Sequence, residues 1–89
     1  MAKYRKKPVV VDKPVVVDAK RWTGTNTRAI LRWMFPDLEP DATWNALTIQ
    51  TLKGELNASP GDWIIKGQAG EYYPCKREIF ERTYELVKE

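Results

Sequence analysis

The stretch from Pro60 to Glu85 constrains the fold most strongly, because turn signals and short strand-forming runs alternate in it with hardly a spare residue. Pro60 and Gly61 suit the central positions of a type II turn, where proline fixes φ and glycine accepts a positive φ. The run 63–66 then predicts a strand, 67–70 a turn, and 71–74 the strand that answers it. Such tight connections indicate neighbouring antiparallel strands.

The remaining sequence predicts one main helix and further strands. We expect a strand over residues 15–22, a helix over 27–35 that Pro36 ends, a short second helix over 75–81 and a closing strand over 83–87. A hairpin over 47–58 is expected to turn at Lys53-Gly54. This order predicts a small α+β domain whose sheet is mostly antiparallel and strongly curled, toward a barrel-like form.

Several side chains are expected to fill the core. The main helix carries one apolar stripe at helical spacing, formed by Ile30, Leu31, Met34 and Phe35. Ile79 and Phe80 are expected to point inward from the short helix. Trp44 lies in a polar loop, so it either plugs the core or is presented to a partner, and we favour the core.

The amino-terminal segment contains a repeat without mismatch, with KPVVVD at residues 7–12 and again at 13–18. Triple valine favours a strand, and a shift of six residues keeps every side chain on its original face. We expect the second copy to enter the sheet because its continuation carries Trp22. Residues 1–12 are then a basic arm, dispensable for folding, that is either mobile or pairs with a sheet edge of this or another molecule. Residues 13–89 form the single α+β domain.

The composition argues against an enzyme. The chain has no histidine, one serine and one cysteine, so no Ser-His or Cys-His pair and no cysteine-histidine zinc site can form. We therefore expect no catalytic residues, no cofactor and no metal. The lone Cys75 cannot make an internal disulfide, and no apolar run approaches the roughly 20 residues that cross a bilayer. A reducing cytoplasm without membrane contact is the expected setting.

The basic residues concentrate in the first third of the chain. Residues 1–33 hold nine Lys and Arg against two acids, whereas residues 34–89 hold six against ten. This asymmetry predicts either a footprint for nucleic acid or another polyanion, or simply attraction between the two parts. The candidate polyanion contacts are Lys3, Tyr4, Arg5, Lys6, Lys7, Lys20, Arg21, Arg28 and Arg32.

A second candidate site is the protein-partner patch of Tyr72, Tyr73, Lys76 and Arg77. Adjacent tyrosines in a strand point to opposite faces, so one is expected in the core and the other exposed. An exposed tyrosine beside two cations suits a protein partner or a small phosphorylated ligand.

Three segments resemble a family of small proteins encoded by tailed bacteriophages and prophages, mostly hypothetical. They are KYRKKPVVVDAKRWTG, once the inserted second KPVVVD is allowed for, TLKGELNASPGDWIIKG, and GEYYPCKREIFERTYE. The family's carboxy-terminal pattern reads PGDWIIKGxxGEYYPCKxxIFExTYE. The doubled KPVVVD departs from the family, which carries it once.

The resemblance implies expression in the cytoplasm of an infected or lysogenic bacterium and an accessory role outside the virion. We therefore expect a non-enzymatic accessory protein that binds a host protein involved in defence, replication or transcription. The alternative is a nucleic-acid-binding accessory protein that uses the basic amino-terminal third.

Overall fold

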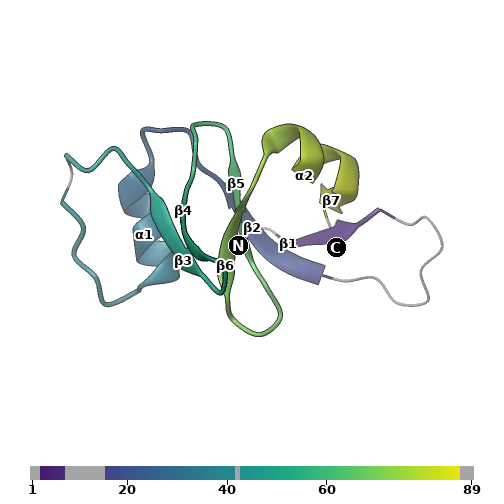
Figure 1. The fold of residues 1–89 in the computed structure, drawn as a ribbon, viewed down its shortest axis with the longest axis horizontal. Helices are drawn as coiled ribbons and strands as arrows, with labels where there is room; N and C mark the ends of the chain where they lie inside the picture. Colours follow the sequence, from purple (N-terminus) through teal and green to yellow (C-terminus); the bar gives the residue numbers. More distant parts are fainter. Residues whose placement is uncertain (1–2, 8–15, 42, 87–89) are drawn as a thin grey trace.

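The computed structural model describes residues 3–7, 16–41 and 43–86. Figure 1 shows a central sheet with one helix and a hairpin at one end and the second helix at the other. In chain order the elements are β1 (Lys3–Lys6), β2 (Val16–Arg21), α1 (Thr27–Met34), β3 (Thr48–Thr51), β4 (Gly54–Asn57), β5 (Trp63–Lys66), β6 (Tyr72–Cys75), α2 (Arg77–Thr83) and β7 (Tyr84–Leu86).

Five strands form the main sheet in the order β6-β5-β2-β1-β7, and β3 and β4 form a separate hairpin that packs beside β6. Every pairing is antiparallel. The expected α+β class with a mostly antiparallel sheet is therefore confirmed. The barrel-like form is not, because the described strands make two separate sheets and no closed barrel.

Different elements cover the two faces of the main sheet; β5 is buried on both faces, whereas Lys3 and Arg5 of β1 leave one face exposed. The first core lies under α1 and the hairpin and consists of Trp22, Ile30, Met34, Leu47, Ile49 and Ile64. The second core lies under α2 and consists of Val17, Ala19, Ile65, Phe80 and Tyr84. Because successive side chains of a strand point to opposite faces, the neighbours Ile64 and Ile65 belong to different cores.

Three residues that we expected in the core are about half exposed: Phe35 (51%), Trp44 (48%) and Ile79 (50%). Phe35 follows the last helical residue with φ −133°, so it leaves the buried stripe of α1. The backbone N–H of Trp44 donates to the carbonyl of Asp41, and this tight turn holds Trp44 at the surface. In α2, Phe80 occupies the single face that meets the sheet.

Strand β1 lies within the segment that we expected to form an arm. It pairs with β2 through Tyr4 and Val17 and with β7 through Arg5 and Glu85, so residues 3–6 lie inside the sheet. Tyr4 packs edge-on against the rings of Trp63 and Phe80, with centroids 5.1 and 5.0 Å away. The alternation of one aromatic with basic neighbours suits a strand with one buried face.

Residues 1–2 and 8–12 of the predicted arm, with most of the first KPVVVD copy, lie outside the described residues. The second copy is described only from Val16, where β2 begins, and β2 then continues to Arg21 as expected.

Replacing Tyr4 by alanine is expected to lower the free energy of unfolding by about 2–3 kcal/mol, since it removes two ring contacts and leaves a cavity in the second core. The matched control is Lys3→Ala on the opposite face of β1, which loses only an exposed ion pair worth about 0–1 kcal/mol. Urea denaturation of both variants measures the difference. Equal stability of the two variants would show that β1 is not a packed strand.

Candidate functional site

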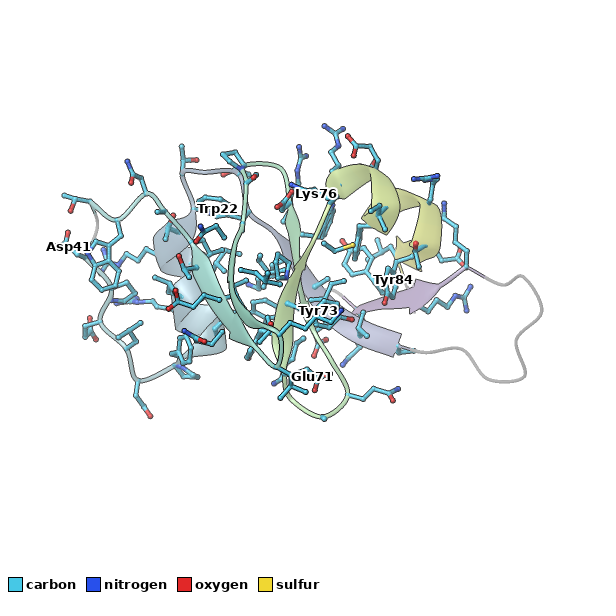
Figure 2. All side chains as sticks on the ribbon, in the orientation of Figure 1. Trp22, Asp41, Glu71, Tyr73, Lys76 and Tyr84 are labelled. Atoms are coloured by element: carbon cyan, nitrogen blue, oxygen red, sulfur yellow. The ribbon has the colours of Figure 1, made fainter. Side chains whose placement is uncertain are left out.

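The structure divides the predicted protein-partner patch into two surfaces. Tyr72 and Tyr73 lie on β6, whereas Lys76 and Arg77 lie at the start of α2. Figure 2 shows Glu71 and Tyr73 toward one end of β6 and Lys76 at the other. The four residues therefore do not form one site.

Both tyrosines are partly buried, so the expectation of one core tyrosine and one exposed tyrosine is wrong. Tyr72 packs against the first core, with its ring centroid 5.3 Å from that of Trp33. Tyr73 packs against the second core and forms a hydrogen bond with Tyr84. The reason is that β6 is covered on both faces, which the strand sequence alone does not reveal.

Tyr72, Tyr73 and Pro74 line an open hollow of about 380 Å³ between β6 and the hairpin, which we call the apolar groove. Its other lining residues are Thr51, Leu52, Lys53, Leu56 and Glu71. Leu52 is fully exposed and Leu56 is partly exposed. The groove therefore offers leucine and tyrosine side chains to a partner.

The sequence did not predict an exposed Leu52, because we expected the hairpin turn one residue later, at Lys53-Gly54. The register pairs Thr51 with Gly54, so the loop is Leu52-Lys53 and Gly54 begins β4. The Thr51 hydroxyl fastens this loop by accepting from the Lys53 N–H at 3.1 Å and donating to the Gly54 carbonyl at 2.9 Å. A leucine at the tip of a two-residue hairpin loop is the sequence feature that could have indicated this exposed binding residue.

A second cavity, of about 540 Å³, lies between the end of β2, the turn before β5 and the start of α2; we call it the polar cleft. Its lining residues are Arg21, Thr23, Ser59, Pro60, Gly61, Asp62, Lys76, Arg77 and Glu78. Three of them are cations, and these come from two segments, the end of β2 and the start of α2. The cleft thus brings Arg21 from the predicted polyanion track together with Lys76 and Arg77 from the predicted partner patch.

The turn at Ser59–Asp62 forms the floor of the polar cleft and is held on two sides. The Asp62 N–H donates to the Ser59 carbonyl at 2.9 Å, and Gly61 has φ +97°, as the sequence predicted for this turn. The Gly61 N–H also donates to the Trp22 carbonyl at 2.7 Å, and the Trp22 N–H donates to the Asp62 carbonyl at 2.9 Å. The turn is therefore fixed to the end of β2.

Asp62 is the buried charge of this cleft, with only 6% of its surface exposed. Its Oδ2 accepts a hydrogen bond from the Ser59 N–H at 2.8 Å and lies 3.9 Å from the Lys76 Nζ. A buried carboxylate requires such partners to offset its lost hydration. Lys76 is the cation nearest to this carboxylate in the cleft.

The remaining predicted polyanion contacts do not form a continuous track. Lys3 pairs with Asp18 at 3.3 Å and Arg5 pairs with Glu85 at 3.1 Å on one face of the sheet. Tyr4 points to the other face, where it packs against the second core and cannot stack on a base without leaving it.

On and near α1 the cations are likewise dispersed. Arg32 pairs with Glu39 at 3.3 Å, and the Lys20 Nζ lies 5.7 Å from the centre of the Trp33 ring. Arg28, on α1, is exposed. Away from α1, Lys7 follows β1 and is also exposed, and its N–H donates to the Thr83 carbonyl at 2.7 Å. The side chain of Lys6 lies outside what the structure describes.

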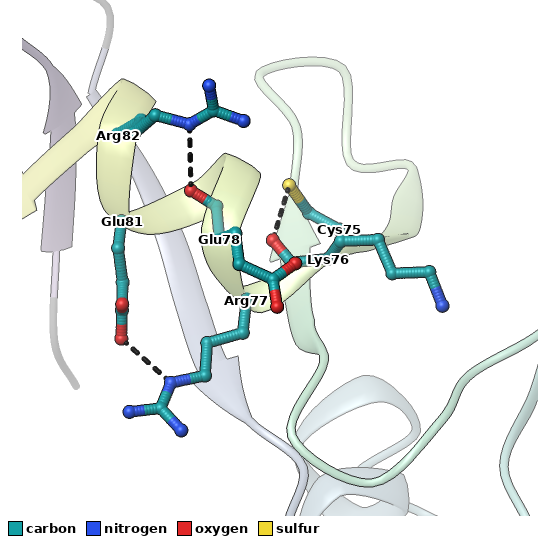
Figure 3. A network of polar contacts seen from close by, with 6 residues as sticks. All are labelled: Cys75, Lys76, Arg77, Glu78, Glu81 and Arg82. Atoms are coloured by element: carbon teal, nitrogen blue, oxygen red, sulfur yellow. Dashed lines mark hydrogen bonds and ion pairs between the residues drawn. The ribbon is translucent and has the colours of Figure 1, made fainter.

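Around α2 the polar contacts are local (Figure 3). The Arg77 Nε donates to Glu81 Oε1 at 3.1 Å, and the Arg82 Nε donates to the Glu78 carbonyl at 3.4 Å. Burial, together with the nearby charge of Asp62, raises the pKa of the Cys75 thiol. A protonated, partly buried thiol is a poor nucleophile.

Within residues 3–7, 16–41 and 43–86, no group of three His, Cys, Asp or Glu side chains is placed to hold a metal ion. Neither helix of this described part is long and apolar enough to cross a membrane. Comparison of the chain with models of protein families, with curated proteins and with solved structures gives no match. Membership of the phage family stays a prediction.

The stability of the protein is expected to fall in alkaline solution because of Tyr73. Burial first, and then its hydrogen bond with Tyr84, raise the pKa of Tyr73 far above its ordinary value of 10.0. The folded state therefore holds this proton more tightly than the unfolded state. The associated stability is complete below about pH 10 and is lost as the pH rises further.

Thermal melting between about pH 8 and pH 11 tests this linkage. Burial also raises the pKa of Tyr4, which adds to the fall in the same direction. Tyr73→Phe removes one titrating group, so its melting temperature should decline less steeply above pH 10 than that of the wild type. Parallel declines of the two proteins would contradict the assignment.

Proposed function

We propose that this chain is a non-catalytic binding protein that contacts a bacterial host protein through the apolar groove. The single observation that carries the proposal is the exposure of Leu52 and Leu56 beside Tyr72 and Pro74 around one open hollow. An exposed leucine at a hairpin tip contributes nothing to either core. Its burial against a partner would remove apolar surface from water.

One side chain of the groove lining, Tyr72, already has packing partners within the protein. Tyr72 is held between the Trp33 ring at 5.3 Å and the Lys66 Nζ, which lies 5.9 Å from its ring centre. A side chain that is already ordered loses little conformational entropy on binding. Lys53 and Glu71 add opposite charges to the lining, as at the polar rim of protein interfaces.

The resemblance to small phage and prophage proteins supports a host protein as the partner, with defence, replication or transcription as the setting. The nucleic-acid alternative has weaker support. It rests on the basic amino-terminal third, where Lys3, Arg5 and Arg32 already have carboxylate partners within 3.3 Å. A surface for a polyanion would instead present unpaired cations along one face.

Leu52→Asp is expected to reduce capture of the host partner from bacterial lysate by about tenfold or more, because it replaces an exposed apolar side chain of the groove lining by a charge. The matched control is Ile79→Asp, which changes a half-exposed apolar residue on α2, outside the groove. Quantitative mass spectrometry of captured proteins compares the wild type with both variants. Circular dichroism confirms that both variants fold.

The proposal is contradicted if the wild type captures no host protein, or if Leu52→Asp captures the same proteins in the same amounts. Equal losses in both variants would also contradict a role of the groove. Fluorescence polarisation with labelled DNA across a salt series covers the alternative. Tight binding that falls steeply with salt and is unaffected by Leu52→Asp would favour the nucleic-acid function instead.

A further inference from the structure

We propose that the polar cleft is a binding site for a phosphate monoester group carried by a small molecule. This inference is independent of the apolar groove, which lies at the other end of β6. The two sites share no lining residue, so either proposal can fail while the other stands.

The first argument is the convergence of cations that keep donors free. Arg21 leaves the end of β2, and its guanidinium makes no ion pair with any described residue. Arg77 uses only its Nε toward Glu81, which leaves its terminal nitrogens available. Two guanidinium groups facing one cleft suit the oxygens of a phosphate, which they can contact in pairs.

The second argument is that the third cation, Lys76, lies beside a buried carboxylate. The Asp62 carboxylate is fixed by the Ser59 N–H at 2.8 Å and lies 3.9 Å from the Lys76 Nζ. That distance is long for an ion pair with a hydrogen bond, so Lys76 is positioned without being fully engaged. A phosphate oxygen can therefore share this ammonium group with Asp62.

The walls also supply neutral donors and room for the rest of the ligand. The Ser59 hydroxyl makes no hydrogen bond with another described residue, and it lies on the same turn as Pro60 and Gly61. A volume of about 540 Å³ exceeds that of a phosphate group and falls within the usual range for small-molecule sites. Pro60 offers an apolar surface to the organic part of a monoester.

Glu78 opposes the binding of an anion, and its replacement therefore provides a test of opposite sign. Its carboxylate lines the same cleft as the three cations, and it repels a negative ligand. Removing this charge should therefore tighten binding, whereas removing a cation should weaken it. A merely structural role of these residues would not produce opposite signs.

The test is a titration of the folded protein followed by ¹⁵N–¹H NMR at constant ionic strength. The probes are inorganic phosphate, O-phosphoserine and a nucleoside monophosphate, with acetate as the anion control. Saturable shifts are expected at the amides of Asp62, Lys76 and Arg77 for the phosphate probes, and the monoesters should bind more tightly than free phosphate. Acetate should produce little change.

Arg21→Gln and Arg77→Gln should each weaken binding of the monoesters about three- to tenfold, because each removes charge-assisted hydrogen bonds. Glu78→Gln should strengthen binding. Arg28→Gln, which removes an exposed arginine on α1 outside the cleft, is the matched control and should leave binding unchanged.

Four results would overturn the proposal. The first is the absence of saturable shifts up to about 20 mM ligand, a concentration well above the dissociation constant of even a weak specific site. The second is an equal loss in Arg28→Gln and Arg21→Gln, which would indicate attraction to the net charge of +3 alone. The third is weaker binding by Glu78→Gln. Tighter binding of free phosphate than of either monoester would likewise contradict the assigned ligand class.

Discussion

The antiparallel pairing of β2 with β5 is the constraint on which the rest of the structure depends. These strands lie inside the main sheet, and the register sets Ala19 opposite Ile65 and Lys20 opposite Ile64. Ile64 and Ile65 are both almost fully buried. Because they are neighbours in one strand, their side chains point to opposite faces of the sheet. One four-residue strand therefore contributes to both cores, and a shift of one residue would exchange its two faces.

The two candidate sites follow from this arrangement. Because the hairpin covers β6 on the side of the first core, its loop leaves a hollow beside Tyr72, and this hollow is the apolar groove. At the other end of β6 the chain enters α2 and meets the turn that precedes β5, and the polar cleft forms there. Residues that are close in sequence thus serve two separate surfaces.

The features that could be predicted from the sequence are those that depend on residues close together in the chain. The type II turn at Pro60–Gly61, the strand that follows it and the ends of α1 depend on proline, glycine and short-range periodicity, and they lie close to where they were expected. The burial of Tyr72 on one face and Tyr73 on the other could not be predicted. It depends on which distant elements cover β6.

The same limit explains the residues that were misplaced. β1 lies between β2 and β7 because Tyr4 completes an aromatic cluster with Trp63 and Phe80, which come from the opposite end of the sequence. For the candidate sites, the sequence indicated Lys76 and Arg77 but not their meeting with Arg21, and it missed Leu52. Both facts follow from strand register, which a single sequence leaves open.

The claim that one sheet separates two cores can be tested directly by nuclear Overhauser effects from isoleucine methyl groups. The account predicts contacts from the Ile64 methyls to Trp22 and from the Ile65 methyls to Phe80. It predicts no contact between Ile64 and Phe80 or between Ile65 and Trp22. Contacts from both isoleucines to the same aromatic residue would contradict it.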